Sequence, residues 1–264
     1  MKIAIIGTGN LGSSIAKGLI NNKSFTSLYL ADKNTMNVEV YREEDYVTVT
    51  NDNVKAVENS DMVIFALQPK HINAVLESVA SKFTDKHIVI SVAAGVEIPR
   101  IEGIIGKDKN IIRVMPNTAI SIGKSMTCIA ANEKAQDKVS LAQDIFNQLG
   151  TTLVIPEDLI QAATVICASG IAFWMRLVRA TTQGAIQLGF EAHEAHQLAT
   201  QTCFGAASLL IESGRHPEQE IDRVTTPSGC TIEGLNAMEH QGLSSALIQG
   251  IVASFEKINQ IKKN

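Results

Sequence analysis

The stretch Lys2-Ile-Ala-Ile-Ile-Gly7-Thr-Gly9-Asn-Leu-Gly12 decides the predicted fold. An apolar run from Lys2 to Ile6 leads into the pattern G-x-G-x-x-G, and a helix-like segment follows directly. A strand, a glycine turn and a helix in this order are typical of a dinucleotide-binding βαβ unit. In that role Gly7 allows the tight turn, Gly9 lets the backbone approach a pyrophosphate, and Gly12 lets the helix pack on the strand. The opening of the following helix faces the negative charge.

Short β-branched apolar runs alternate with longer helix-like segments through the first half of the chain. We expect strands at Lys2 to Ile6, Ser27 to Ala31, Val47 to Thr50, Met62 to Leu67, Ile88 to Val92, Asn110 to Met115, Ser125 to Ala130 and Thr151 to Val154. This alternation predicts an α/β, Rossmann-like domain over residues 1–156, with a doubly wound, mostly parallel sheet.

The second half of the chain is predicted to be all-helical, over residues 157–264. No proline lies between Pro156 and Pro217, and apolar residues recur at three and four spacing through two long segments. We expect helices at Ile160 to Leu188, Ala195 to Ile211, Thr231 to Gln241 and Leu243 to Ile261. Because these segments are apolar on more than one stripe, we expect them to pack against a second copy of the chain.

Composition and charge exclude several classes of protein. The 264 residues are 45% apolar and 19% charged with a net charge of −4, so disorder and nucleic-acid binding are disfavoured. We expect no membrane span, because contiguous apolar runs fall short of ~18 residues, and we expect no secretory signal. The four cysteines form no C-x-x-C pair, which indicates reduced thiols in a cytoplasmic protein and no metal site.

Asp32 follows the second predicted strand, 20 residues beyond Gly12. An acid there accepts hydrogen bonds from the adenosine ribose hydroxyls, which favours NADH. Lys33 comes next, and an ammonium group there suits the 2′-phosphate of NADPH. The sequence leaves the choice between the two cofactors open.

Two later strand ends carry small or hydrogen-bonding residues. The segment Ser91 to Val96 leaves room for a flat ring at the carboxyl edge of the sheet. The segment Arg113 to Thr118 contains a proline-fixed turn and two side chains able to bind an amide or a hydroxyl. Ordinary structural turns have the same composition. The residues alone therefore leave open whether these two segments bind a ligand or only form turns.

In this order, and followed by a helical half, these motifs resemble the pyrroline-5-carboxylate reductase family over essentially the whole chain. The most specific stretch is Asp222-Arg-Val-Thr-Thr-Pro-Ser-Gly-Cys-Thr-Ile232, which is similar to the family signature D-x-V-[ST]-[ST]-P-G-G-T-T-I. The other stretches are Gly7 to Gly12, Ser91 to Val96, Arg113 to Thr118, Gln201-Thr202, Gly205 to Ala207 and His216-Pro217.

The resemblance implies reduction of 1-pyrroline-5-carboxylate to proline, the last step of proline biosynthesis, by hydride transfer from NADPH or NADH. It also implies that the all-α domain forms a homodimer, or a ring of such dimers. Carried over, the substrate site comprises Thr226, Pro227, Ser228, Gly229, Cys230, Ser169 and Gly170, with Thr231 as the catalytic residue beside the imine nitrogen. The cofactor site comprises Gly7, Thr8, Gly9, Asn10, Leu11, Gly12, Asp32, Lys33, Asn53, Ala66, Gln68, Pro69, Ala93, Ala94, Gly95, Met115, Pro116 and Asn117.

A helix that begins at Thr231 exposes unpaired N–H groups, which bind an anion. The turn before Thr231 therefore suits the carboxylate of a substrate. The same threonines also suit simple helix caps, and the residues alone leave both interpretations open.

The chain departs from the family pattern at three places. Cys167-Ala-Ser-Gly-Ile-Ala-Phe173 stands where the family has Ser-Gly-Ser-Gly-Pro-Ala-Tyr, so we expect a straighter and more apolar helix there. Ser228 replaces the first glycine of the turn, and Gln68-Pro69-Lys70 stands where Lys-Pro is usual. These departures leave open a reductase of other imines and a catalytically silent NAD-binding relative.

A β-hydroxyacid dehydrogenase is the rival that shares this domain order. Enzymes of that class use a lysine on the helical domain. This chain has no lysine between Lys138 and Lys257, which argues against that class.

Overall fold

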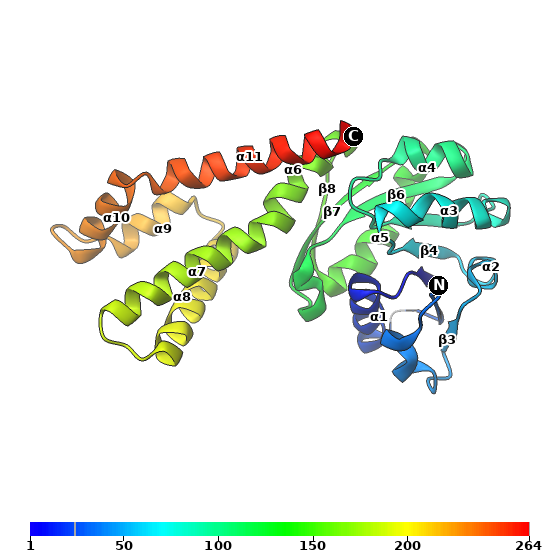
Figure 1. Ribbon diagram of the computed structural model, residues 1–264, viewed down its shortest axis with the longest axis horizontal. Coiled ribbons are helices and arrows are strands. Elements are labelled where there is room, and N and C mark those ends of the chain that lie inside the picture. Colours follow the sequence, from blue (N-terminus) through cyan, green and yellow to red (C-terminus); the bar gives the residue numbers. More distant parts are fainter. Residues whose placement is uncertain (24, 264) are drawn as a thin grey trace. The chain divides into compact units, whose positions relative to one another are not determined.

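The computed structural model describes residues 1–23 and 25–263. The chain separates into two compact units, Met1–Ala168 and Ser169–Asn264 (Figure 1). The first is built on a sheet and the second is helical, so the predicted fold class is confirmed.

The first unit contains one sheet of eight strands in the order β3-β2-β1-β4-β5-β6-β7-β8. The strands are β1 (Lys2–Ile6), β2 (Ser27–Ala31), β3 (Val47–Thr50), β4 (Met62–Phe65), β5 (Ile88–Ser91), β6 (Asn110–Met115), β7 (Ser125–Ala131) and β8 (Gly150–Val154). All neighbours are parallel except β6 and β7, which are antiparallel. All eight predicted strands are therefore present, with ends displaced by no more than two residues.

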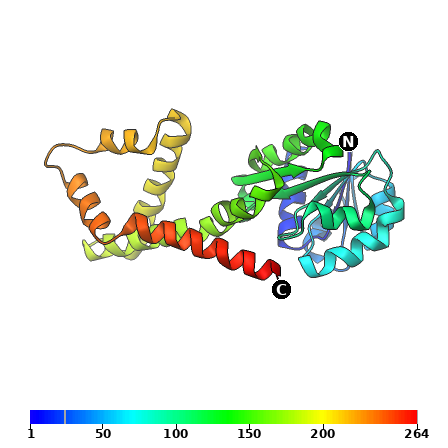
Figure 2. The same cartoon turned by 90° about the horizontal axis from the view of Figure 1, so that it is seen from above.

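Helices cover both faces of this sheet (Figure 2). They are α1 (Asn10–Asn22), α2 (Asn53–Glu58), α3 (Pro69–Val79), α4 (Ile98–Ile105) and α5 (Val139–Phe146), with α6 (Ile160–Thr164) after the last strand. Side chains of α1 and α5 pack on one face, and those of α2, α3 and α4 pack on the other. The doubly wound arrangement follows from this division.

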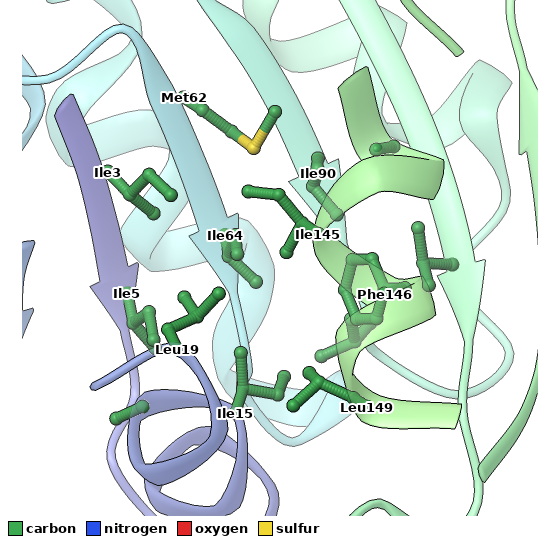
Figure 3. Close-up of a cluster of buried hydrophobic side chains, with 14 of the residues drawn as sticks. Ile3, Ile5, Ile15, Leu19, Met62, Ile64, Ile90, Ile145, Phe146 and Leu149 are labelled. Carbon is green, nitrogen blue, oxygen red and sulfur yellow. The ribbon is translucent and has the colours of Figure 1, made fainter. Parts of the chain in front are cut away.

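The core arises because successive residues of a strand point to opposite faces. Ile3 and Ile5 of β1 join one apolar cluster, whereas Ala4 and Ile6 join the other, and all four are at most 1% exposed. In Figure 3 the first two lie near Ile64 of β4, and Leu19 of α1 packs in the same cluster. Burying each isoleucine side chain stabilises the fold by about 1.5–3 kcal/mol.

The first unit extends beyond its last strand, through Ile155 to Ala168. Ile160 of α6 is fully buried against Met115 of β6 and Cys128 of β7. We call residues 155–168 the linking segment, because the second unit follows it directly. The division at residue 156 stays a prediction.

The second unit consists of α7 (Gly170–Gln187), α8 (Ala192–Ser213), α9 (Pro217–Val224), α10 (Cys230–His240) and α11 (Leu243–Lys263). Helices α7 and α8 pack along each other. The four predicted helical segments are confirmed. The short helix α9 was not predicted, and Val165–Ser169 form a π-helical segment inside the helix expected at Ile160 to Leu188.

The expectation that no stretch is long and apolar enough to span a membrane is wrong at one place. The helical run Glu157–Gln187 has an 18-residue window of mean hydropathy 1.5, of which 17% is buried. Polar Gln, Thr and Ser residues interrupt this run, so a search for contiguous apolar residues missed it. Helices of this length and composition also occur in the cores of soluble proteins.

Candidate functional site

The glycine turn after β1 has the close packing that its sequence predicts. Gly7 has φ +97°, and a Cβ atom there would lie 2.5 Å from the carbonyl oxygen of Ala66. At Gly12 a Cβ atom would lie 1.9 Å from the carbonyl oxygen of Gly7, so only glycine lets α1 approach the turn. At Gly9, by contrast, a Cβ atom would meet nothing within 4 Å. The backbone is therefore open at the one glycine whose predicted role is to face a ligand.

The N-terminus of α1 adds a second feature that suits an anion. Gly9 is its N-cap residue, and no side chain caps the helix there. Uncapped N–H groups and the helix dipole together favour a phosphate group. The turn and the helix thus offer the backbone donors that a pyrophosphate needs.

Asp32 lies at the end of β2 and supports the turn directly. Its Oδ2 accepts a hydrogen bond from the Thr8 amide (2.6 Å), and its Oδ1 accepts one from the Asn34 amide (3.0 Å). Asn37 Nδ2 donates to the Thr8 carbonyl (2.9 Å), which ties the next loop to the same point. Each carboxylate oxygen keeps a further lone pair, so Asp32 remains able to accept from a ribose hydroxyl.

A cleft of about 500 Å³ opens beside this turn. It lies at the carboxyl ends of β1, β2 and β4, where the sheet order reverses, and ligands of open α/β sheets bind at such a point. Seven predicted cofactor residues line it, namely Gly7, Gly9, Asp32, Lys33, Asn53, Ala66 and Gln68. The structure thus brings together residues from positions 7 to 68 of the chain.

The remaining predicted cofactor residues do not line this cleft. Thr8 is fully buried, Asn10, Leu11 and Gly12 form the first turn of α1, and Pro69 begins α3. Ala93, Ala94 and Gly95 follow β5, whereas Met115 ends β6 and precedes Pro116 and Asn117. The last six lie at the carboxyl ends of neighbouring parallel strands.

Sequence reasoning missed several residues of the cleft. Lys70 and His71 line it from the first turn of α3, and Ala74 and Val75 line it from the next turn. The signal that could have found them is the reversal of strand order beside β1, because the helix after β4 must then border the site.

The backbone N–H and both polar side-chain atoms of Asn117 make hydrogen bonds that hold the loop after β6. Its backbone N–H donates to Ser125 Oγ (3.1 Å), and its Oδ1 accepts from the Ala119 amide (3.0 Å). Its Nδ2 donates to the Cys167 carbonyl (2.9 Å) in the linking segment. Asn117 therefore connects this loop to the helical run that leads into the second unit.

Two thiols lie near the same loop. Cys128 on β7 is paired in register with Met115, and it packs in one apolar cluster with Cys167. A hydrogen bond from the Cys128 thiol lowers the pKa of Cys167 to about 7, and that bond, with burial, raises the pKa of Cys128. Sequence spacing alone did not reveal this pair of thiols. All four cysteines are free thiols.

The helix expected at Cys167 to Phe173 has an irregular start, and its predicted straightness stays a prediction. Val165–Ser169 are π-helical although no proline is present. Irregular turns of this kind arise where another group enters the helical hydrogen-bond ladder, and the Asn117 amide does so at Cys167.

In the second unit, Thr226 to Gly229 form a tight turn before α10. The Gly229 amide donates to the Thr226 carbonyl (3.0 Å), with Pro227 and Ser228 as the central residues. Ser228 has φ +58°, a conformation that favours glycine, so this residue is strained where the family signature has glycine. At Gly229 a Cβ atom would lie 2.4 Å from Thr226 Oγ1, so a larger residue there would have to displace the Thr226 side chain.

Helix α10 begins directly after this turn with an uncapped N-terminus. Gly229 is its N-cap residue and no side chain caps it, so the first amides, Cys230 and Thr231 among them, lack helical partners. Thr231 also lines an apolar groove of about 290 Å³ with residues of α8 and α9, whereas Ser169 and Gly170 do not line it. The predicted turn residues are therefore together, and the two residues near the start of α7 stand apart from that groove.

The chemistry of these groups fits a dinucleotide and a small anion. The open backbone at Gly9, the uncapped α1 and the Asp32 carboxylate suit NADPH or NADH. Among residues 1–23 and 25–263, no group of three or more His, Cys, Asp or Glu side chains could hold a metal ion.

Two models of protein families match the chain. One, described as pyrroline-5-carboxylate reductase dimerisation, matches residues 157–261. The other, described as NADP oxidoreductase coenzyme F420-dependent, matches residues 2–95. Together they cover the helical half and most of the sheet.

Relatives and solved structures point the same way. Pyrroline-5-carboxylate reductase 2 of Dictyostelium discoideum is 40% identical over 97% of this chain and 91% of its own length. Pyrroline-5-carboxylate reductase 1 of that organism is 45% identical over 97% of this chain, which spans about half (49%) of that relative. A solved pyrroline-5-carboxylate reductase from Coxiella burnetii has a TM-score of 0.93 at 30% identity, covering 98% of this chain and 97% of that one.

Proposed function

The chain belongs to the pyrroline-5-carboxylate reductase family, and we propose that it reduces 1-pyrroline-5-carboxylate to proline with NADPH or NADH. The observation that carries the proposal is the turn from Thr226 to Gly229. It matches the most specific family motif and leads into an uncapped helix N-terminus. Such a terminus suits the carboxylate of a small ring acid.

We assign the substrate carboxylate to the amides that follow this turn, at Cys230 and Thr231, supported by Thr226, Pro227, Ser228 and Gly229. The side chain of Thr231 then lies beside the ring nitrogen, where its hydroxyl holds or relays the proton that this nitrogen needs. We also assign Ser169 and Gly170 to the wall of the substrate site, on the resemblance alone. None of these groups is a charged catalyst, which suits an iminium that is already electrophilic.

The bound dinucleotide supplies the hydride for this reaction. The glycine turn holds its pyrophosphate through the amides from Gly9 to Gly12. Ala93 to Gly95 and Met115 to Asn117 border the nicotinamide ring at the carboxyl edge of the sheet. Holding the ring against the imine carbon at a reactive distance supplies much of the acceleration.

Asp32 and Lys33 together decide the preference between the two cofactors. The Asp32 carboxylate favours the ribose hydroxyls of NADH, and the Lys33 ammonium favours the 2′-phosphate of NADPH. Asp32→Ser removes the repulsion of a phosphate, so the ratio of kcat/KM for NADPH to that for NADH should rise about tenfold. Steady-state assays with each cofactor measure this ratio, and an unchanged ratio removes Asp32 from the ribose site.

The helical half, which we place at residues 157–264, is the part that pairs two copies of the chain. The match of residues 157–261 to a dimerisation model supports this assignment. The exposed apolar face of Glu157–Gln187 is then covered by the partner copy rather than by lipid. We propose a cytoplasmic homodimer, and light scattering and cell fractionation test whether dimers join into rings or associate with membranes.

Oxidation of NADPH and NADH by the purified protein tests the function. The substrates are pyrroline-5-carboxylate and, in parallel, other cyclic imines, ketopantoate and 3-oxoacids. We expect cofactor oxidation with the pyrroline and stoichiometric proline. Faster oxidation with another imine would make the protein a reductase of different substrate range, and dinucleotide binding without any oxidation would make it a silent relative.

A further inference from the structure

Two loops of the first unit are held by a single carboxylate from the linking segment. Glu157 comes three residues after β8. Its Oε1 accepts a hydrogen bond from the Ile98 amide (2.6 Å) and one from Arg113 Nη1 (3.2 Å). These two donors lie 59 and 44 residues away along the chain.

Both contacts are made where water competes little. The Arg113 side chain is 4% exposed and that of Glu157 is 26% exposed, so this pair is more buried than an ordinary surface ion pair. Ile98 is the first residue of α4, and Glu97, the N-cap residue, makes no side-chain cap hydrogen bond. Glu157 thus caps α4 from another part of the chain and also balances a buried guanidinium.

Each contact lies close to a loop that we assign to the nicotinamide ring. Arg113 stands two residues before Met115 on β6, and the loop from Met115 to Asn117 follows. Ile98 closes the loop that contains Ala93 to Gly95. Ser91, which precedes that loop, is paired in register with Arg113. One carboxylate therefore fixes the distance between the two loops.

The linking segment makes a second contact with the same region. Asn117 Nδ2 donates to the Cys167 carbonyl, ten residues after Glu157. The segment that leads into the helical half thus binds Asn117 at the end of this loop and Arg113 two residues before its start.

We propose that Glu157 is a positioning residue for hydride transfer, holding the loops at 93–97 and 115–117 at the spacing that the nicotinamide ring requires. The inference rests on the proposed function, since it assigns those loops to the ring. Glu157 acts through Arg113 and the α4 N-terminus and touches neither substrate nor cofactor.

Glu157→Gln is the most conservative substitution that tests the proposal. The amide keeps the size of the side chain and an oxygen for the Ile98 amide, but it removes the charge that faces Arg113. The matched control is Asp158→Asn, which makes the same change at an exposed neighbouring position. Single-turnover hydride transfer should slow about tenfold in Glu157→Gln, because small displacements of reacting groups cost that much or more. Dinucleotide affinity should change less than threefold.

Two further readouts separate positioning from stability. With C4-deuterated cofactor, the isotope effect on kcat should rise in Glu157→Gln, since hydride transfer becomes rate-limiting. Arg113→Gln added to Glu157→Gln removes the unpaired buried charge and should restore the melting temperature without restoring the rate. Recovery of both, or an equal slowing in Asp158→Asn, would overturn the proposal.

A measurement without substrate separates failure of the positioning role from failure of the proposed function. The emission of bound NADPH reports the surroundings of its nicotinamide ring without any substrate. We expect this emission to change in Glu157→Gln and to stay the same in Asp158→Asn, whichever imine the protein reduces. Unchanged emission and rate in Glu157→Gln would refute the positioning role even if proline formation is confirmed.

Discussion

The two units bury their apolar side chains very differently. In the first unit, both faces of the sheet carry clusters of fully buried residues, such as Ile64 and Phe146. Among the described residues of the second unit, only Gly170, Thr182, Ala195 and Ala199 are buried. Its large side chains are exposed instead, with Trp174 and Phe204 both at 60%. The first unit has a hydrophobic core of its own, whereas the second leaves large apolar side chains exposed.

The exposed apolar side chains of the second unit, together with its match to a dimerisation model, support the proposed pairing of two copies. Grooves of about 650 and 290 Å³ lie on its helices, and both are lined mainly by apolar side chains. Exposed patches of this kind mark surfaces that a partner covers. The second groove contains Thr231, so the residue that we propose for catalysis lies in a groove of this exposed apolar surface.

The largest effect should come from charging the exposed face of the second unit. Trp174→Glu with Phe204→Glu places two carboxylates in the larger groove, where a partner would leave them buried and unpaired at several kcal/mol each. We expect a monomer by light scattering and a loss of about 100-fold or more in kcat/KM. The first unit should still bind dinucleotide.

Gln183→Glu with Gln197→Glu is the matched control, because it adds the same charge at exposed polar positions of the same two helices. The control should keep the mass and activity of the native protein. A double variant at Trp174 and Phe204 that still dimerises would show that this groove is not the interface.

A smaller effect, confined to the first unit, should follow from Gly9→Ala. A methyl group there meets no protein atom within 4 Å, so the fold should be unaffected. It occupies the space assigned to the pyrophosphate, so the dissociation constant for NADPH should rise about tenfold. Fluorescence titration measures it.

Gly12→Ala is the contrasting variant, because its methyl group would lie 1.9 Å from the Gly7 carbonyl oxygen. It should lower the melting temperature as well as dinucleotide affinity. Equal melting temperatures for the two variants would contradict the packing described for the turn.

The smallest effect is expected at the turn of the second unit. Ser228→Gly relieves a left-handed conformation that costs about 1 kcal/mol in a residue other than glycine. The greater freedom of glycine in the unfolded chain offsets part of that gain. The free energy of unfolding should therefore rise by less than about 1 kcal/mol, as denaturant titration measures. A marked loss of stability would mean that the Ser228 hydroxyl has a role of its own.

The sheet was predictable from sequence because its strands are buried on both faces and read as continuous apolar runs. The glycine turn was predictable because Gly7 and Gly12 are required by close backbone packing, whereas Gly9 leaves the backbone open to a ligand. Helix α9 was not predicted, since half of its eight residues are charged and eight residues are too few to establish a helical period. The contribution of α3 to the cleft depends on strand order, which local patterns do not contain.

Polar contacts between residues far apart in the chain could not be predicted from the sequence. Arg113 and Glu157 lie 44 residues apart, and neither stands in a motif that requires the other. The π-helical segment arises at the Asn117 contact, so it appears only once the fold is formed. The sequence motifs identify the types of residue at the candidate site. The tertiary structure determines which of these residues come into contact.

We propose that the first unit binds the dinucleotide and that Thr231 of the second unit acts beside the reacting nitrogen. Thr231→Ala tests it most directly, with NADPH titration and pyrroline-5-carboxylate turnover measured on the same preparation. We expect turnover to fall about 100-fold and the NADPH dissociation constant to change less than twofold. A parallel loss of both, or no loss of turnover, would contradict it.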